Sequence, residues 1–487
     1  MQAVDNGLYR YEQVERRIHE MIDAGDYRPG ERLPSLRGLS RSMGVSLATA
    51  GQAYAELERK GLVEARERSG FFVREGVRRL PAPVADTAAP TLPAMVNRGT
   101  LIRSVLEGMG RDGLLQLGVA QTCPDLLPAK ALSRCLGRVA REQPLTCIEY
   151  ESIRGNMELR RQIATRIMDA GMGVRPEEVL VTAGAMEGLY LSLRALTRPG
   201  DTVVIQSPTY YCFLQLLENL GLKTVEIPSC PESGVDPADL HAAVNTYDVR
   251  ACILTPNFNN PDGALMPEEA KREIVDILAR REIPLVEDDV YGELAFGPKR
   301  PGSCKRHDRK GLVIYCSSFS KTLAPGWRVG WIVPGRFLDR ALDAKSTTNV
   351  NVATPQQLAL AEYLGGGGYE RHLKRLRRIL EGQMRAMQAS IARHFPQDTR
   401  MTAPRGGTEL WLELPRGVDS IRYYMEARNR RIGVCPGVIF STQDRYGNFI
   451  RMNCGNPFTP ELERGVAVLG ALAGELGTEP DGGAGRP

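Results

Sequence analysis

The residues best suited to covalent chemistry lie in the run Ser317-Ser-Phe-Ser-Lys321-Thr-Leu-Ala-Pro-Gly-Trp-Arg328. A strand-like apolar stretch at 312–316 leads into a loop of small residues that presents the Lys321 amine, and Arg328 follows a Pro-Gly turn seven residues later. An amine that can form a Schiff base and a cation that can bind a phosphate are the groups that pyridoxal phosphate requires. A surface lysine in a polar loop is the alternative, but the strand, the turn and the arginine favour a cofactor site.

Other strand-like runs in the same part of the chain also end in polar or aromatic groups. The runs at 178–182, 202–206, 250–254, 283–287 and 312–316 alternate with helical stretches, which predicts a mostly parallel sheet covered on both faces. Ligands bind at the carboxyl ends of such strands, so the groups that follow them should meet at one edge. These groups are the backbone N–H groups of Gly184, Ala185 and Met186, the ring of Tyr210, the amide of Asn260, the carboxylate of Asp288 and the phenol of Tyr291.

Each of these residues also has an ordinary structural explanation. Tyr210 could be a core aromatic residue, Asp288 a helix cap and Asn260 part of a turn. Their occurrence one after another at successive strand ends is harder to explain in this way, so the pattern favours a ligand site.

The composition indicates more than one domain and no membrane span. At 487 residues with 42% hydrophobic content, the chain suits a small and a large domain, because a single core rarely grows beyond about 250 to 300 residues. No apolar run approaches the ~20 residues that a bilayer span requires, so we expect a soluble, cytoplasmic protein. The ten cysteines include no C-x-x-C pair and the five histidines have no metal-ligand spacing, which predicts reduced thiols and no metal.

The N-terminal segment has the pattern of a helix-turn-helix. Residues 11–24 place apolar side chains along one helical face. Ser35 and Ser46 are good N-cap residues for short helices at 36–43 and 47–60, and Gly44 makes the turn between these helices.

A β-hairpin with a positive tip follows these helices. Residues 62–73 are predicted to form the hairpin, with Arg66, Arg68 and Gly70 at its tip, so the segment is a winged helix-turn-helix. From Tyr27 to Arg79 there are eleven Lys and Arg against six Asp and Glu, a surplus that equals the net charge of +5 of the whole chain. Such a local excess attracts a phosphate backbone, although an ordinary solvated surface is the alternative.

Changes in composition predict the domain boundaries. We expect a DNA-binding domain at 1–79, a linker at 80–109 that begins with a Pro- and Ala-rich stretch, a ligand-binding domain at 110–475 and a disordered tail at 476–487.

The N-terminal domain resembles the GntR family of bacterial regulators. The resemblance rests on the run PGERLPSLRGLSRSMGVSLATAGQAYAELERKGLVEARERSGFFV and covers residues 8 to 74. It implies that Arg37 and the start of the second helix, from Ser46 to Thr49, face double-stranded operator DNA, with Arg66 and Arg68 of the wing on the backbone or in the minor groove.

The residues that read bases are not fixed by this resemblance. Family members often place arginines where this chain has Leu47 and Gly51. Thr49 and Gln52 could instead donate or accept hydrogen bonds at base edges, while packing of Thr49 in the core of the domain is the alternative.

The second domain resembles the fold-type I aminotransferases over residues 110 to 475, an α/β pyridoxal-phosphate-dependent transferase fold with large and small subdomains. The resemblance implies a covalent link from the cofactor to Lys321, pairing of Asp288 with the ring nitrogen, hydrogen bonds from Asn260 and Tyr291 to the ring oxygen, and stacking by Tyr210. It also implies phosphate binding by the backbone of Gly184, Ala185 and Met186 together with Ser318 and Arg328.

Two further residues follow from the same resemblance. The run FIRMNCGNPF matches the strand that supplies the arginine for the substrate carboxylate, here Arg451, whose guanidinium can form a bidentate pair. Tyr150, in EYESIRG, matches the tyrosine that reaches the phosphate of a neighbouring subunit, which implies a homodimer.

A GntR-type head ahead of an aminotransferase-like body is the architecture of the MocR/GabR class of regulators, and LPSLR, EDDVY and CSSFSK resemble its YdcR-like branch. The implied function is a pyridoxal-phosphate-dependent, DNA-binding transcription regulator that senses an amino acid or a related amine. The alternative is an active aminotransferase with a fused DNA-binding head. One departure from many such regulators supports the alternative, because Asn260 stands before a proline, as in true transaminases.

Overall fold

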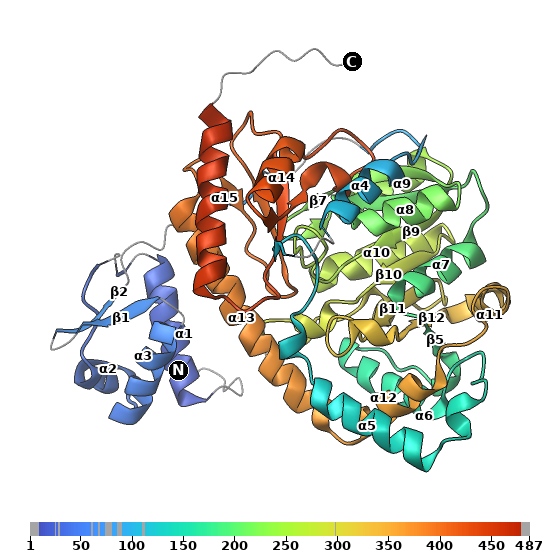
Figure 1. Cartoon of the computed structure of the whole chain (residues 1–487), viewed down its shortest axis with the longest axis horizontal. Coiled ribbons are helices and arrows are strands. Elements are labelled where there is room, and N and C mark those ends of the chain that lie inside the picture. The colour runs from blue at the N-terminus through green and yellow to red at the C-terminus, as the bar shows by residue number, and fades with distance from the viewer. Residues whose placement is uncertain are drawn as a thin grey trace. The chain divides into compact units, whose positions relative to one another are not determined.

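The structure is a computed structural model that describes residues 9–24, 26–27, 30–59, 62–66, 69–73, 80–84, 90–109, 113–297 and 299–478. Contacts divide the chain into two compact units: residues 1–80 together with 384–395, and residues 81–383 together with 396–487. Figure 1 shows the helices and strands of both units, coloured along the chain. None of the described helices is both long enough and apolar enough for a membrane span.

The helices of the first unit are α1 (Arg10–Ala24), α2 (Leu36–Met43) and α3 (Leu47–Arg59). Local capping groups bound helix α2 and the start of helix α3. Ser35 caps α2 by accepting a hydrogen bond from the backbone N–H of Gly38, and Gly44 ends it in the left-handed conformation, at φ 63°. Ser46 accepts from the N–H of Thr49 at the start of α3.

The wing packs on α3 through aromatic side chains. Strands β1 (Val63–Arg66) and β2 (Gly70–Val73) are antiparallel. Tyr54 of α3 is fully buried, its ring lies 4.4 Å from that of Phe71 in β2, and its hydroxyl donates to the carbonyl of Pro34. The Tyr54 side chain thus joins α3 to the wing and to the segment before α2. The winged helix-turn-helix expected for this part of the chain is confirmed.

A nine-stranded sheet forms the centre of the second unit, with strand order β3-β7-β6-β9-β10-β11-β12-β5 and β8 paired with β7. Strands β7, β6, β9, β10 and β11 are mutually parallel, and β12 runs antiparallel to both of its neighbours. The strands are β3 (Ala94–Met95), β5 (Leu180–Thr182), β6 (Thr202–Ser207), β7 (Lys223–Cys230), β8 (Gly234–Val235), β9 (Val249–Leu254), β10 (Leu285–Asp288), β11 (Val313–Ser318) and β12 (Gly330–Val333).

Helices cover both faces of this sheet. Helix α7 (Ala185–Leu196) packs on one face. There Cys316 and Ile332 lie so close to Gly188 that a side chain at this position would not fit. Helices α9 and α10 pack on the opposite face in an apolar cluster with β6, β7 and β9. The helices of the large subdomain are α5 (Ala129–Glu142), α6 (Met157–Ile167), α7 (Ala185–Leu196), α8 (Tyr211–Asn219), α9 (Pro237–Thr246), α10 (Glu268–Arg280), α11 (Leu338–Ser346) and α12 (Thr354–Gly365). The mostly parallel, two-sided sheet predicted from the sequence is confirmed.

A smaller subdomain follows along the chain. Its sheet has the order β13-β14-β17-β16, and a parallel pair joins β15 to β4. Its elements are α13 (Gly368–His394), β13 (Arg400–Met401), β14 (Glu409–Glu413), α14 (Ser420–Asn429), β15 (Ile432–Gly433), β16 (Cys435–Pro436), β17 (Phe449–Asn453) and α15 (Pro460–Thr478), with β4 at Leu115–Gln116. Only the part of α13 up to residue 383 belongs to the second unit, and the part from residue 384 belongs to the first unit.

The structure differs from the sequence-based expectation at both ends of the second unit. Within the expected linker, β3 pairs with β7 at the sheet edge and residues 99–109 form α4 (Gly99–Met109), which contacts α8 and buries Ile102 and Val105. The linker was predicted from its Pro and Ala content, which does not reveal this apolar helical spacing. Helix α15 runs to Thr478, beyond the expected boundary at 475, and residues 479–487 lie outside the described part of the chain.

Candidate cofactor site and DNA-binding surface

The residues predicted to act together follow strands that are neighbours in the sheet. Strands β6, β9, β10 and β11 lie side by side and parallel, so the groups after them emerge at one edge. These groups are Tyr210 after β6, Asn260 after β9, Asp288 at the end of β10 and Tyr291 after it, and Ser318 at the end of β11 and Lys321 after it. The segment of Gly184 follows β5, on the far side of β12.

Lys321 points its amine into the interior of the second unit. Its Nζ donates a hydrogen bond to the carbonyl of Ala120 at 2.7 Å and lies 5.2 Å from the ring centre of Tyr291. Burial lowers the pKa of Lys321 below its usual value, and the positive charge of Arg451 acts in the same direction, against Glu409 and Asp288. A lower pKa increases the fraction of neutral amine, which is the form that attacks a carbonyl group.

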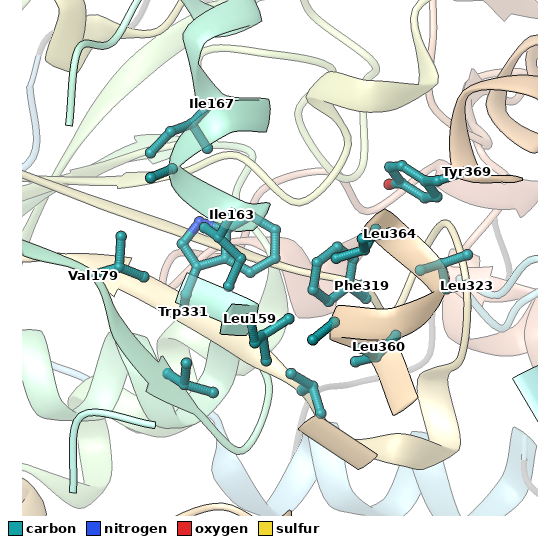
Figure 2. Close-up of a cluster of buried hydrophobic side chains, with 14 of the residues drawn as sticks. Leu159, Ile163, Ile167, Val179, Phe319, Leu323, Trp331, Leu360, Leu364 and Tyr369 are labelled. Carbon is teal, nitrogen blue, oxygen red and sulfur yellow. The ribbon is translucent and has the colours of Figure 1, made fainter. Parts of the chain in front are cut away.

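An apolar core fixes the loop that carries Lys321. Phe319 and Leu323, two residues to either side, are buried in a cluster with Trp331 of β12 and with side chains of α6 and α12, as Figure 2 shows. The hydroxyl of Tyr369 donates to Oγ1 of Thr322 at 2.9 Å. The residues around Lys321 are therefore held from both the core and α13, which positions the amine.

Asp288, the last residue of β10, is a buried carboxylate without an ion-pair partner among the described residues. Burial, and then the neighbouring Asp289 carboxylate, raise the pKa of Asp288 to about 7, while the backbone N–H of Val290, 3.3 Å from Oδ1, and Lys321 oppose the shift. Asp289 differs, because it accepts hydrogen bonds from Arg300, Tyr315 and Asn257. Asp288 is thus the carboxylate left available for a cationic ligand atom.

The N-terminus of α7 and Arg328 form a cradle that suits an anion. Gly184 precedes the helix at φ 83°. As at the start of any α-helix, the first backbone N–H groups, those of Ala185 and Met186, have no partner within the helix. Arg328 lies against Gly184 so closely that a Cβ atom there would collide with the guanidinium. Its Nη2 donates to the carbonyl of Ala183 at 3.2 Å and its Nη1 to Oγ of Ser320 at 3.3 Å. Helix N-terminus and guanidinium together favour a phosphate.

Arg328 adopts a backbone conformation that is uncommon for residues other than glycine. Its φ is 51°, in the left-handed region, directly after the short helix η7 (Pro325–Trp327). Such conformations cost free energy and persist where the surroundings fix them. Ser318, at the end of β11, is buried and its hydroxyl accepts from the N–H of Ser320.

Asn260, Tyr291 and Arg451 belong to one buried polar group that is linked by hydrogen bonds and by the ion pair of Arg451 with Glu409. Arg451, in the middle of β17, is fully buried; its Nη1 donates to Oδ1 of Asn260 at 2.8 Å and its Nη2 to the carbonyl of Gly118. The hydroxyl of Tyr291 donates to Oε1 of Glu409 at 3.2 Å. Tyr210, the N-cap of α8, lies beside this group with its ring 4.8 Å from that of Tyr211.

Three residues that contact the expected site residues were not predicted from the sequence. Glu409 of β14 lies beside Arg451, Ser320 contacts Arg328, and Thr122 donates from its hydroxyl to the carbonyl of Lys321. The search for residues that follow strands does not find Glu409, which lies within a strand, or Thr122, which comes from a distant loop. Ser320 does follow β11, but nothing in the sequence distinguishes it from the neighbouring serines. The one available signal for Glu409 was an acidic residue directly before the apolar run Leu410-Trp-Leu412.

Tyr150 is not part of the buried group. Its side chain is 92% exposed, and two apolar side chains nearby in the sequence, Leu145 and Ile148, are 72% and 82% exposed. No group of three or more His, Cys, Asp or Glu side chains in the described parts of the chain is placed to hold a metal ion.

The residues predicted to face DNA lie mainly on the surface of the first unit. Arg37 at the start of α2, Ser46, Gln52 and Arg66 are exposed, and Thr49 is half-buried. Oγ1 of Thr49 lies 2.8 Å from Oγ of Ser46, and Arg66 pairs with Glu64 and lies over the ring of Phe72. Arg68 lies outside the described residues. Thr49 is therefore tied to the helix cap and is not a fully buried core residue.

Comparison with known proteins identifies the class to which each part belongs. The family profile described as "Aminotransferase class I and II" matches residues 115–469, and that of "Bacterial regulatory proteins, gntR family" matches residues 10–73. The solved structure of LysN, an α-aminoadipate aminotransferase from Thermus thermophilus complexed with N-(5'-phosphopyridoxyl)-L-leucine, covers 77% of this chain and 94% of its own, with TM-score 0.71 and 30% identity.

Full-length relatives share both parts in the same order. YdcR of Escherichia coli K12, an uncharacterized HTH-type transcriptional regulator, is 36% identical over 96% of this chain and 100% of its own length. YjiR of the same organism, described in the same way, is 35% identical over 95% of this chain and 98% of its own. The chain belongs to the aminotransferase class I and II family and, with its gntR-family head, to the MocR-like regulators of the YjiR and YdcR type.

Proposed function

We propose that this protein is a DNA-binding transcription regulator whose aminotransferase-like body binds pyridoxal phosphate and senses an amino acid or a related amine. The observation that carries the proposal is the presence, in one chain, of a gntR-family head and of an amine, a buried carboxylate and an anion cradle at one sheet edge. The names of the full-length relatives support the regulatory role. A protein that acts on DNA would do so where the chromosome lies, in the cytoplasm.

The residues at the sheet edge fit pyridoxal phosphate. Asp288 is a buried carboxylate that has no cationic partner among the described residues, which suits a protonated ring nitrogen. Gly184 keeps the N-terminus of α7 clear next to Arg328, which suits a phosphate. The aminotransferase class I and II family generally uses this cofactor, and the LysN structure holds a derivative of it.

Each residue would then have a distinct task. When bound, pyridoxal phosphate supplies an aldehyde carbon for amines and a ring that withdraws electrons. Lys321 would hold it covalently through its neutral amine, and Asp288 would accept a hydrogen bond from the ring nitrogen. Ser318, Arg328 and the backbone from Gly184 to Met186 would bind its phosphate, while Tyr210 would stack on the ring.

Asn260 and Tyr291 would donate hydrogen bonds to the ring oxygen of the cofactor. Arg451 would bind a carboxylate of the amino-acid ligand. Arg451 donates to Asn260 and to the carbonyl of Gly118 and also interacts with the hydroxyl of Tyr211, so a ligand carboxylate would replace part of these contacts at the guanidinium.

A homodimer would complete the arrangement. The exposed side chains of Leu145, Ile148 and Tyr150 are apolar or aromatic and lie within six residues of one another. A patch of this kind favours burial against a second copy, where Tyr150 would reach the partner's phosphate site. A dimer also carries two heads for two half-sites of operator DNA, where Arg37, Ser46, Thr49, Gln52, Arg66 and Arg68 would make the contacts.

An active aminotransferase is the second candidate function, because Lys321, Asp288, Asn260 and Arg451 lie together and provide the amine and polar groups that transamination needs. One titration separates the two functions. An amino acid added to the purified protein should change the cofactor absorbance; a stable change supports sensing, whereas reversal of the change by a 2-keto acid with release of product supports transamination.

The cofactor site itself is tested by Lys321→Ala. We expect borohydride reduction followed by mass spectrometry to find the cofactor on Lys321 of the wild type and on no residue of the variant. Lys310→Ala, which changes an exposed lysine paired with Glu282, is the matched control and should retain the label. A label on Lys60 or Lys374 of the wild type would show that the assignment is wrong.

A further inference from the structure

A buried acidic side chain faces the arginine that would bind the ligand. Glu409 of β14 is 2% exposed and Arg451 of the paired strand β17 is 0% exposed, and Oε2 of Glu409 lies 3.2 Å from Nε of Arg451. The other oxygen, Oε1, accepts from the hydroxyls of Tyr291 at 3.2 Å and Thr408 at 2.8 Å. These neighbours are all donors, as an ionised carboxylate requires.

No hydrogen bond joins the side chains of Glu409 and Arg451. Oε2 of Glu409 and Nε of Arg451 are both buried and neither has a hydrogen-bond partner among the described residues, although they form an ion pair. Glu409 also acts electrostatically on Lys321, where its negative charge raises the pKa against the effect of burial. A buried acceptor with free capacity therefore lies within reach of the charges that surround the reacting amine.

The charges at this end of the site balance without any ligand. Arg451 contributes one positive charge and Glu409 one negative charge, while Asp288 and Arg328 lie at the cofactor's ring nitrogen and phosphate. Burial lowers the pKa of Lys321, which shifts its amine toward the neutral form, so Lys321 is not counted as a further positive charge. A ligand carboxylate would thus share a single guanidinium with Glu409, and an excess negative charge in a buried site is costly.

We propose that Glu409 is a specificity-determining residue that selects amino acids with a cationic side chain, a proposal that rests on the function proposed above. The α-carboxylate of such a ligand would bind the guanidinium of Arg451, and its side-chain ammonium would donate to Oε2 of Glu409, which has no hydrogen-bond partner among the described residues. The site would then be neutral. This count takes the α-amino group as uncharged, because it gives up its ammonium proton when it replaces the Lys321 amine on the cofactor's carbon. On the same count a neutral amino acid leaves one excess negative charge, and a dicarboxylic amino acid leaves two.

Three six-carbon amino acids that differ only at the end of the side chain test this selection. L-Lysine ends in an ammonium group, L-norleucine in a methyl group and L-2-aminoadipate in a carboxylate. Each is titrated into the wild-type protein loaded with pyridoxal phosphate, and binding is followed by cofactor absorbance and by calorimetry. We expect lysine to bind at least about tenfold more tightly than norleucine, and 2-aminoadipate to bind most weakly.

Two glutamine variants attribute the preference to one side chain. Glu409→Gln should reduce the lysine-to-norleucine ratio of affinities to within about threefold, because the amide cannot pair with an ammonium as a carboxylate does. Glu413→Gln is the matched control: it makes the same change on the same strand, at a residue that pairs with Arg400 instead. Glu413→Gln should keep the wild-type ratio.

The outcomes separate this inference from the proposed function. Equal or tighter binding of norleucine or 2-aminoadipate by the wild type overturns the selection by Glu409, and so does an unchanged ratio in Glu409→Gln; amine sensing stands in either case. If Glu409 merely holds Arg451 in place, Glu409→Gln weakens all ligands alike, which also overturns the inference. If no amino acid changes the cofactor absorbance at all, the proposed function fails and the inference fails with it.

Discussion

At the scale of single residues, burial sets the charge of the groups that would do chemistry. It lowers the pKa of Lys321 and raises that of Asp288, so each is shifted toward its neutral form. A protonated ring nitrogen beside Asp288 would reverse the second shift by stabilising the carboxylate. The stability of the protein without cofactor should therefore depend on pH in a way that the cofactor removes.

Asp288→Asn tests this dependence. The pKa of Asp288 rises from 3.8 to about 7 on folding, so folding takes up a proton between these values. The contribution to stability is fully present below pH 4 and is lost as the pH rises through 7, by on the order of a few kcal/mol. Unfolding of the cofactor-free wild type and variant is measured from pH 5 to pH 8. Relative to wild type, the variant should gain stability as the pH rises, and a constant difference would refute the assignment.

Two substitutions of Arg451 separate its charge from its shape. Arg451→Leu leaves Glu409 buried without a cation, which should cost about 3 to 5 kcal/mol of folding stability. Arg451→Lys keeps a charge near Glu409 but loses the planar fork, so it should retain more stability while ligand affinity falls by about ten- to a hundredfold. Denaturant unfolding and ligand titration measure the two effects. Wild-type ligand affinity in Arg451→Lys would exclude a bidentate role.

At the scale of elements, the loops that leave the strands fix the site more than the strands do. The loop after β5 ends in Gly184, whose φ of 83° and contact with Arg328 leave no room for a side chain. The loop after β11 is held by Phe319 and Leu323 in the core around Trp331 (Figure 2). The cradle at α7 and the amine of Lys321 are thus placed by separate local structures.

Gly184→Ala tests the cradle. The variant should lose stability through backbone strain, by about 1 to 3 kcal/mol, and should also release the cofactor because Arg328 must move. Gly200→Ala is the matched control, since Gly200 has φ 92° and open space where a Cβ would lie. Cofactor retention on gel filtration should fall only in Gly184→Ala. Equal retention in both variants would show that the cradle does not bind the phosphate.

The elements that were predicted well carry their own boundary signals. Helix α2 was expected at 36–43 and forms there, because Ser35 and Gly44 cap it with local hydrogen bonds. The strand-end residues come at or a few residues after the ends of apolar runs, so their place at one sheet edge could be predicted, while their binding roles stay predictions. The contact of Glu409 with Arg451 gave no such signal, since it depends on the register of β14 against β17. Helix α4 was missed because the apolar side chains that it buries are covered by α8, a contact that the local sequence does not reveal.

At the scale of the whole molecule, one chain joins a DNA-binding family to an enzyme family. The gntR-family profile covers residues 10–73 and the aminotransferase profile residues 115–469. For regulation, ligand binding in the second unit must change the DNA affinity of the first, and a coupling of about 1 to 3 kcal/mol is typical of such switches. By linkage, DNA must then change the ligand affinity by the same factor.

The most direct test measures DNA affinity with and without ligand. DNA selected from random sequences by the full-length, cofactor-loaded protein is titrated at fixed salt, with and without an amino acid that changes the cofactor absorbance. We predict that the ligand changes the dissociation constant by about 5- to 150-fold in the wild type and leaves it unchanged in Lys321→Ala. An unchanged dissociation constant in a wild-type protein saturated with ligand would contradict the regulatory function.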